Sequence, residues 1–319
     1  MTRLREDWLK TLEHETALYE KELLYKTGLD FVGIAAASND ISPEALREKS
    51  CTHKIAVVPV TSGKGVIGGF TVSVAAILRQ AGFRAFITEA SDVSGVYEAY
   101  SKGAAFVFMA DDRRYIGLDL NRRHISDNSA ATARGFVAAL AAMCPETLVK
   151  KKVLVLGCGE VGLLAVEALL KRNALPILYD KAPVGQEAGR RFNIPCLHSA
   201  LDISGYQYIL DATDEGGWLT VEMLHANVRI AAPGVPLSPD AGALERHGGR
   251  IVHDLLHIGT LAMLGELCCY ETVSDTWGAG RIDRIDSKSM LPGETPGPLA
   301  KRKPAADRRP PYAFIPRSP

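Results

Sequence analysis

Two glycine-rich turns have the residue types and the spacing that bind an anionic group. Both match the pattern G-x-G-x-x-G and follow a short apolar run; the glycines are Gly63, Gly65 and Gly68 in the first turn and Gly157, Gly159 and Gly162 in the second. In this pattern the glycines allow a tight turn and let the backbone approach a pyrophosphate. The pattern alone predicts a dinucleotide site at either turn, so the neighbouring residues must decide between them.

The second turn has the complete surroundings of a dinucleotide site. It follows the apolar run VLVL, and a helix beginning at Glu160 and Val161 directs backbone N–H groups towards the anion. Asp180 ends the next predicted strand, 23 residues after Gly157, where a carboxylate accepts ribose hydroxyls and repels a 2′-phosphate. We therefore assign this turn to the cofactor and expect NAD rather than NADP, although Lys181 weakens that preference.

The first turn is more polar, and we assign it to the substrate. Thr61, Ser62 and Lys64 surround Gly63, and Pro59 removes one N–H from the strand that leads into the turn. Hydroxyls, an ammonium group and free amides at the carboxyl end of a parallel strand suit a ligand that carries a carboxylate. The alternative is that these glycines only permit a tight turn.

Two further loops follow predicted strands and border the expected cofactor crevice. The loop DATDEGG at 211–217 contains Thr213, and the loop AAPGVP at 231–236 contains Pro233 and Gly234. In a doubly wound sheet such loops lie at the carboxyl ends of the strands, beside the cofactor. We expect Pro233 and Gly234 to shape a wall for the nicotinamide ring.

Two adjacent acids end the third predicted strand in the motif MADD. We expect one of Asp111 and Asp112 to cap the following segment and the other to point into the cleft; a purely capping role is the alternative. His253 and His257 have the i, i+4 spacing of a helical metal pair, but His253 is expected to precede the helix, so no metal is predicted. No recognisable Ser/His/Asp or Cys/His motif supports covalent catalysis.

Alternating strands and helices must position these residues. The sequence predicts an amphipathic helix at 6–26, which Gly28 ends. Strands are expected at 55–60, 83–88, 104–109, 151–157, 176–179, 206–210, 228–231 and 251–252. Helices are expected at 66–81, 93–102, 129–143, 160–171 and 258–268. This alternation predicts an α/β fold: two α/β domains with parallel sheets, the second a Rossmann dinucleotide-binding fold, preceded by the N-terminal helix.

Length and composition set the domain boundaries and exclude several functions. The 319 residues suit about two domains, which we place at 1–148 and 149–270. The segment 271–319 is expected to be a disordered basic tail, because eight of the 17 prolines lie in the last 33 residues. The chain carries 37 basic and 37 acidic side chains, which disfavours nucleic acid as the main partner.

The remaining expectations concern location, thiols and partners. No apolar stretch is long enough to span a membrane, so a cytoplasmic protein with no membrane partner is predicted. The six cysteines form no CxxC pair and are expected to be free thiols. The expected partner is a small-molecule amino-acid derivative, and a homodimer is left open.

Several motifs together resemble one family. They are VPVTSGKGVIGGF at 58–70, SDVSGVYEA at 91–99, MADD at 109–112, VLVLGCGEVG at 153–162, APGVP at 232–236 and HIGTLAML at 257–264. Across about residues 20 to 268 the chain resembles the pyrrolysine biosynthesis protein PylD family. The VPVTSG turn combined with DVSG and MADD is specific, whereas the second glycine turn alone would match any Rossmann dehydrogenase.

The resemblance implies an NAD-dependent oxidation of an amine, the last step of pyrrolysine biosynthesis. The family's substrate is L-lysine acylated on its side-chain nitrogen by 3-methyl-D-ornithine. Hydride leaves the carbon that bears the terminal amine, the imine is hydrolysed with release of ammonia, and the aldehyde is captured by the ornithine α-amine. Loss of water then closes the pyrroline ring.

The resemblance also implies roles for residues of this chain. Ser62 and Asp111 would hold and orient polar groups of the substrate together with Thr61 and Gly63, and Asp111 would be a candidate for proton transfer. Asn128 would lie nearby, and the N-terminal helix would cover the active site. Where the family has a Glu-Pro pair before its last helix, this chain has Asp254-Leu255. The catalytic candidates that the resemblance implies are therefore Ser62, Asp111 and Asp254, with Asp254 one methylene shorter than the family's Glu and without the proline that follows it.

Two other functions remain open from the residues alone. One is a different NAD(P)-dependent dehydrogenase that acts on an amino acid or a keto acid. The other is a dinucleotide-binding sensor in which NAD occupancy shifts an assembly. A sensor needs no proton acceptor beside the nicotinamide, so loss of turnover with retained NAD binding after Asp111→Asn would separate an enzyme from a sensor.

Overall fold

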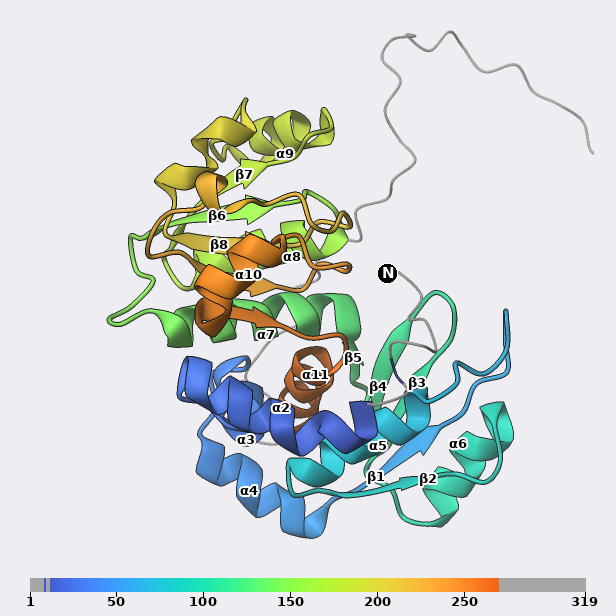
Figure 1. Ribbon diagram of the computed structural model, residues 1–319. Helices are drawn as coiled ribbons and strands as arrows, with labels where there is room; N and C mark the ends of the chain where they lie inside the picture. Colours follow the sequence, from blue (N-terminus) through green and yellow to red (C-terminus); the bar gives the residue numbers. More distant parts are fainter. Residues whose placement is uncertain (1–8, 10–11, 270–319) are drawn as a thin grey trace, which may run out of the picture. The chain divides into compact units, whose positions relative to one another are not determined.

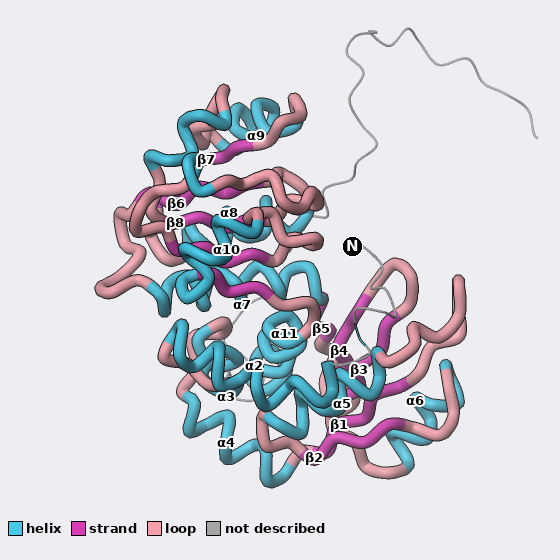
Figure 2. The backbone as a smooth tube through the Cα atoms, viewed as in Figure 1, coloured by secondary structure: helices cyan, strands magenta, loops and turns pink. Residues whose placement is uncertain are grey.

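The computed structural model describes residue 9 and residues 12–269 of the 319-residue chain. The described residues contain two five-stranded sheets, and helices cover both (Figures 1 and 2). The α/β class predicted from the sequence is therefore confirmed. All described residues belong to one compact unit, so the division into domains at 1–148 and 149–270 stays a prediction. The segment from 270 onwards lies outside the described residues.

The N-terminal sheet is mixed, with the strand order β2-β1-β3-β4-β5. Its strands are β1 (Lys54–Val58), β2 (Arg84–Ile87), β3 (Phe106–Ala110), β4 (Tyr115–Asp119) and β5 (Ile125–Asp127). β1 pairs in parallel with β2 and β3, whereas β4 runs antiparallel to β3, and β5 to β4. Parallel pairing is confirmed for the three strands predicted in this half, but β4 and β5 are not predicted, and they make the sheet mixed rather than parallel. Tight turns at 111–114 and 119–124 reverse the chain twice without a crossover helix.

The C-terminal sheet is wholly parallel, with the order β10-β9-β8-β6-β7. Its strands are β6 (Lys152–Leu156), β7 (Leu175–Tyr179), β8 (Tyr208–Asp211), β9 (Arg229–Ala232) and β10 (Ile251–His253). An isolated parallel bridge between Leu178 and Cys196 adds one more position beyond β7. Counted with this bridge, the order is that of a dinucleotide-binding Rossmann sheet, and the switch in strand order falls between β6 and β8.

The helices largely match the predicted ones, and several more are present. They are α2 (Leu12–Thr27), α3 (Phe31–Ala37), α4 (Pro43–Thr52), α5 (Phe70–Gln80), α6 (Asp92–Ser101), α7 (Asn128–Met143), α8 (Glu160–Lys171), α9 (Val184–Phe192), α10 (Ala241–His247) and α11 (His257–Cys269). The start of the helix predicted at 6–26 lies outside the described residues. Its end is confirmed, because Gly28 adopts a φ of +75° and donates its N–H to the carbonyl of Leu24.

Helices α7 and α11 connect the two sheets. α7 packs against α8 of the C-terminal half and against α11, and α11 also packs against α3 and β4 of the N-terminal half (Figure 1). Gly135 permits the close approach of α7 to α11, because a Cβ atom there would lie 2.5 Å from a methyl carbon of Ile258. One continuous apolar core therefore reaches from the N-terminal sheet to the C-terminal sheet.

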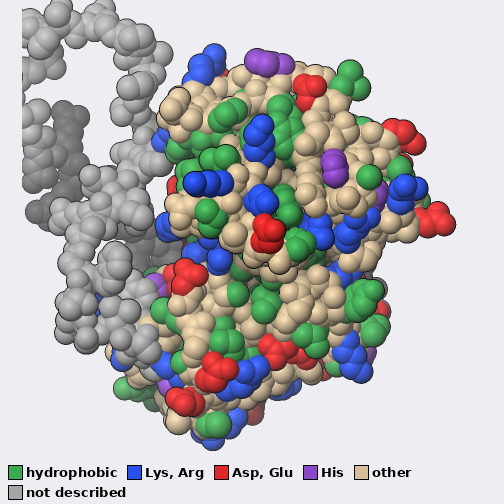
Figure 3. All heavy atoms as spheres, turned by 90° about the vertical axis from the view of Figure 1, so that its left-hand side faces the viewer, with side chains coloured by type: hydrophobic (Ala, Val, Ile, Leu, Met, Phe, Trp, Pro, Cys, Tyr) green, Lys and Arg blue, Asp and Glu red, His purple; other side chains and the backbone are tan. Residues whose placement is uncertain are grey.

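The surface carries charges of both signs. On the face drawn in Figure 3, acidic and basic side chains are interspersed over the described part of the chain. No helix among the described residues has the length and apolar character needed to cross a membrane. In the same residues, no group of three His, Cys, Asp or Glu side chains is arranged to hold a metal ion.

Candidate active site

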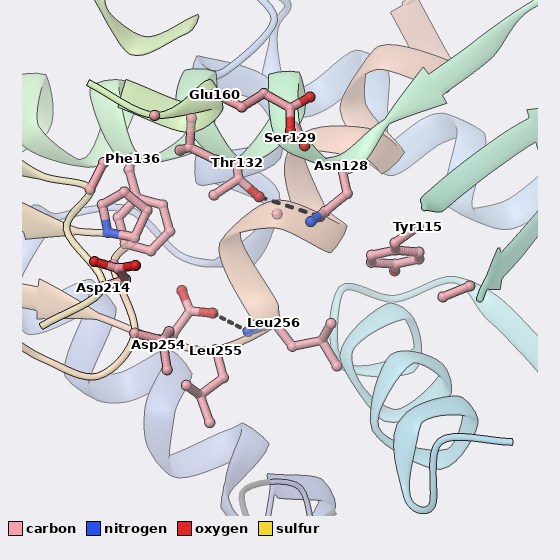
Figure 4. Close-up of a pocket in the computed structure, with 18 of the residues that line it drawn as sticks. Tyr115, Asn128, Ser129, Thr132, Phe136, Glu160, Asp214, Asp254, Leu255 and Leu256 are labelled. Atoms are coloured by element: carbon pink, nitrogen blue, oxygen red, sulfur yellow. Dashed lines mark hydrogen bonds between the residues drawn. The ribbon is translucent and has the colours of Figure 1, made fainter. Parts of the chain in front are cut away.

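A cavity of about 380 Å³ lies between residues that follow strands of both sheets. Its N-terminal walls come from the end of β3, the start of β4 and the start of α7. Its C-terminal walls come from the second glycine turn and the loops after β8 and β9. Asp254, Leu255 and Leu256, between β10 and α11, also line it (Figure 4), as does Gly259. The cavity thus combines residues from both halves of the chain.

The three glycines of the second turn have three different surroundings. A Cβ atom on Gly157, whose φ is +83°, would lie 2.7 Å from the carbonyl oxygen of Ala212. A Cβ atom on Gly162 would collide with the carbonyl oxygen of Gly157, so this glycine permits the contact of α8 with the strand. At Gly159 a Cβ atom would meet nothing within 4 Å. The turn is therefore closely packed at its first and third glycines and open at the second, where a pyrophosphate would approach.

Asp180 binds the glycine turn directly. Its Oδ2 accepts a hydrogen bond from the backbone N–H of Cys158 at 2.8 Å, and its Oδ1 accepts one from Ala182 at 2.8 Å. Lys181 forms an ion pair with Glu215 on the loop after β8. The acidic residue expected from the sequence is thus fixed beside the turn, and the neighbouring cation is paired with a carboxylate.

Asp211, at the end of β8, orders its own loop through its carboxylate and contacts the loop after β9 through its backbone carbonyl. Asp211 is 1% exposed, and its Oδ1 accepts hydrogen bonds from the backbone N–H of Thr213 at 3.2 Å and from its hydroxyl at 2.7 Å. The backbone N–H of Gly234 donates to the carbonyl of Asp211 at 2.9 Å. Burial raises the pKa of Asp211. Thr213, Pro233 and Gly234 line the cavity as a consequence.

The first glycine turn differs from the second in how it meets its helix. Thr61 donates both its backbone N–H and its hydroxyl to Asp92, at 2.8 and 2.5 Å. A Cβ atom on Gly63 would collide with the carboxylate of Asp112. The helix α5 begins only at Phe70, four residues later than predicted, after Gly69 at a φ of +79°.

Of the segment 61–70, Ile67 and Phe70 line the cavity; Thr61, Ser62 and Gly63 do not. Their role in substrate binding stays a prediction.

Asp111 and Asp112 both line the cavity, and both accept backbone hydrogen bonds. The Oδ1 of Asp111 accepts the N–H groups of Arg113 and Arg114, each at 2.7 Å, and these bonds lower the pKa of Asp111. Asp112 accepts the backbone N–H of Lys64 at 2.8 Å and so connects the hairpin to the first glycine turn. Asp111 therefore caps the following segment, as expected of one of the two acids, but it also lines the cavity, and Asp112 lines the cavity while binding the first glycine turn.

Asp254 lies at the start of α11 and is nearly buried. Its Oδ1 accepts the backbone N–H of Leu256 at 2.7 Å, and its Oδ2 accepts the hydroxyl of Tyr19 at 3.1 Å. Burial acts to raise the pKa of Asp254, but the interaction with His257 outweighs it and the pKa is lowered. His253 ends β10 and its Nδ1 faces the carbonyl of Ala232, so it does not form a ligand pair with His257.

The polar lining of the cavity is acidic. Besides hydroxyl and amide groups, its ionisable side chains include the five carboxylates Asp111, Asp112, Glu160, Asp214 and Asp254, and no Lys, Arg or His is among the described residues that line it. Figure 4 shows Asn128 and Thr132 side by side on α7, with the Thr132 hydroxyl 3.3 Å from Oδ1 of Asn128. No signal in the sequence places Asp214, Thr132 and Tyr115 together, since three separate elements supply them.

The comparisons with known proteins agree on one family. Residues 9–126 match the family model described as pyrrolysine biosynthesis protein PylD, N-terminal domain. The chain is 31% identical over 239 residues to the pyrrolysine synthase of Methanosarcina barkeri, covering 75% of this chain and 87% of that protein. It is 31% identical over 252 residues to the pyrrolysine synthase of Methanosarcina acetivorans, covering 75% and 88%.

Solved structures resemble the chain more distantly. Shikimate 5-dehydrogenase from Thermus thermophilus, in complex with NADP(H) and shikimate, is 14% identical, with a TM-score of 0.45 and coverage of 69% of this chain and 93% of that one. Quinate dehydrogenase from Corynebacterium glutamicum, in complex with NAD, is 13% identical, with a TM-score of 0.42 and coverage of 68% and 93%. The sequence relatives carry the assignment: this chain belongs to the pyrrolysine synthase (PylD) family.

Proposed function

We propose that this chain is a pyrrolysine synthase that uses NAD to oxidise the terminal amine carbon of L-lysine-Nε-(3-methyl-D-ornithine). The observation that carries the proposal is the acidic cavity beside the glycine turn 157–162. Five carboxylates without a cation among the described lining residues favour a substrate that carries ammonium groups, because opposite charges attract strongly in a partly enclosed site. A 2-hydroxy acid or a keto acid would instead meet like charges there.

The residues of the C-terminal half fit NAD. The open face at Gly159 leaves room for the pyrophosphate, and the N-terminus of α8 directs amide groups to it. Asp180, held beside the turn, would accept the ribose hydroxyls, and the pairing of Lys181 with Glu215 disfavours a 2′-phosphate. When bound, NAD supplies the hydride acceptor; Pro233 and Gly234 would form the wall beside it.

The side chains of this protein would accept a proton from the substrate ammonium group and orient the substrate. A hydride leaves an amine carbon only when the nitrogen is neutral, so the ammonium group must first lose a proton to a carboxylate in the cavity. Asp111 and Asp254 are the two candidates among the lining acids. Asn128 and Thr132 supply amide and hydroxyl groups that can orient the substrate. The neighbouring apolar side chains of Ile67 and Phe70 limit the access of water.

The direct test is incubation of the protein with NAD and the lysyl-ornithine amide. Reduced cofactor should accumulate, and mass spectrometry should show that the precursor has lost ammonia and two hydrogens, because the water added during hydrolysis leaves again on ring closure. Turnover of simple amino acids or keto acids, with none of the amide, would favour the other dehydrogenase function. Binding of NAD with no turnover of any of them would favour the sensor.

A further inference from the structure

A buried cluster of Tyr19, Asp254 and His257 lies beside the cavity and joins α2 to the start of α11. His257 is 4% exposed, and neither of its ring nitrogens has a hydrogen-bond partner in the described part of the chain. Its Nδ1 lies 3.7 Å from Oδ1 of Asp254, which is longer than a hydrogen bond. Asp254 itself lines the cavity, whereas His257 does not. The imidazole is thus placed behind a carboxylate that can meet the substrate.

Burying a histidine whose ring nitrogens make no hydrogen bond lowers the stability of the folded protein. A residue kept at this cost is a candidate for a functional role. Both ring nitrogens have lost their contact with water; Nε2 has gained no hydrogen bond in return, and Nδ1 has only the 3.7 Å contact with the carboxylate of Asp254. The aromatic rings around it are arranged to accept a cation, because the ring of Tyr19 lies 4.4 Å and that of Phe31 5.6 Å from the imidazole centroid. The site can therefore hold the ring as an imidazolium, flanked by two aromatic rings and a carboxylate.

Asp111 and Asp254 are weaker proton acceptors than free carboxylates. Two backbone N–H groups lower the pKa of Asp111, and although burial acts to raise the pKa of Asp254, the interaction with His257 lowers it. Imidazole is the side chain that ordinarily exchanges its proton near neutral pH. A base made of Asp254 and an imidazole behind it can therefore hold a proton that neither carboxylate holds alone.

We propose that His257 acts through Asp254 to hold the proton that the substrate ammonium loses before oxidation. In this step the ammonium nitrogen keeps the electron pair of its N–H bond, and the proton passes by way of a carboxylate oxygen of Asp254 to Nδ1 of neutral His257, which must first approach Oδ1 from 3.7 Å to hydrogen-bond distance. Asp254 stays a carboxylate, and no bond to carbon changes. His257 is therefore a positioning residue, since it contacts the substrate only through Asp254.

Other charged or titratable groups lie around this cluster, and their effects must be distinguished from that of His257. From α2 they are Tyr19, Glu22 and Lys26, which contacts the carbonyl of Ile251, and from β10 His253. α3 contributes the ring of Phe31. The Tyr19 hydroxyl donates to Asp254, and burial, followed by the charge of Asp254, raises the pKa of this tyrosine. Tyr19 therefore stays a hydrogen-bond donor and does not compete for the proton.

The inference rests on the proposed amine oxidation, and a double-mutant cycle tests it separately. His257→Gln should lower kcat about 10- to 100-fold with little change in KM for the precursor. It should also change the dependence of kcat on pH, which a merely structural role would leave unaltered. Asp254→Asn should cost at least as much, and the double variant no more than Asp254→Asn alone, within about twofold, because both act on one proton. His247→Gln, at a buried histidine remote from the cavity, is the matched control and should keep the wild-type kcat and pH profile.

Each outcome has a distinct meaning. No turnover of the precursor by the wild-type protein contradicts the proposed function itself. Wild-type turnover with an unchanged pH profile in His257→Gln, or with losses that multiply in the double variant, overturns the role of His257. If His257→Gln does not fold, Tyr19→Phe replaces it, since this change removes only the hydroxyl that faces Asp254. Its kcat should fall severalfold in the wild-type background and not at all in the Asp254→Asn background; an equal fall in both would contradict a cluster that acts through Asp254.

Discussion

At the scale of single residues, two glycines of the second turn have different roles: Gly159 leaves space for NAD, and Gly162 permits close packing. Gly159 has a φ of −72° and open space at its Cβ position, so Gly159→Ala should fold normally and yet weaken NAD binding at least tenfold by filling the pyrophosphate position. Gly162→Ala should instead lower stability by about 1–3 kcal/mol, because the methyl group meets the carbonyl of Gly157. Calorimetric titration with NAD measures the affinity of Gly159→Ala, and thermal unfolding measures the stability of Gly162→Ala. The control is Gly65→Ala, where a φ of +87° should cost about 1–2 kcal/mol while NAD affinity is kept. Weakened NAD binding in Gly65→Ala alone would mean that the two turns are exchanged.

At the scale of elements, a partly buried acid, Glu266, links α11 to α7 and β5. Glu266 accepts hydrogen bonds from Ser126 at 2.6 Å and from Arg134, and its Oε1 lies 3.4 Å from His124. Burial acts to raise the pKa of Glu266, but its hydrogen bonds and the charge of Arg134 outweigh it, so the pKa is lowered from 4.5. A depressed pKa means that the stabilisation is present above the pKa of the unfolded chain and is lost as the pH falls through that of the folded protein. Glu266→Gln should therefore lower the free energy of unfolding by about 1–3 kcal/mol at neutral pH and by less in acid. Urea unfolding at several pH values measures this, and a loss that grows towards acid pH would contradict it.

The sequence predicts many of the elements but not all of them. The strands of the C-terminal sheet were found within about two residues, because continuous apolar runs such as 153–156 are typical of strands buried on both faces. The strands β4 and β5 were missed because the turn after Asp111 depends on two side-chain hydrogen bonds that no periodicity reveals. Thr213, Pro233 and Gly234 line the cavity beside the second glycine turn, and their contact with the cofactor stays a prediction. Tyr19 and His257 were not foreseen, since 238 positions separate them and only tertiary packing brings them together.

At the scale of the whole molecule, one core spans both sheets, so the described part of the chain should unfold in a single transition. A ligand that binds the folded chain stabilises it by about 2.7 kcal/mol at a concentration 100 times its Kd. Saturating NAD should therefore raise the Tm by several degrees in the wild-type protein and hardly at all in Gly159→Ala. Differential scanning calorimetry measures both. Two separate transitions, with NAD shifting only one, would show that the halves fold independently.

The proposed function depends on one step, in which hydride leaves the terminal amine carbon of the precursor and reaches NAD. A precursor that carries two deuterium atoms on that carbon makes this step visible by mass spectrometry. We expect one deuterium to appear in the reduced cofactor for each pyrroline ring formed, the other to stay in the product, and one ammonia to be released. Reduced cofactor without deuterium, or ring formation without reduced cofactor, would contradict hydride transfer from that carbon.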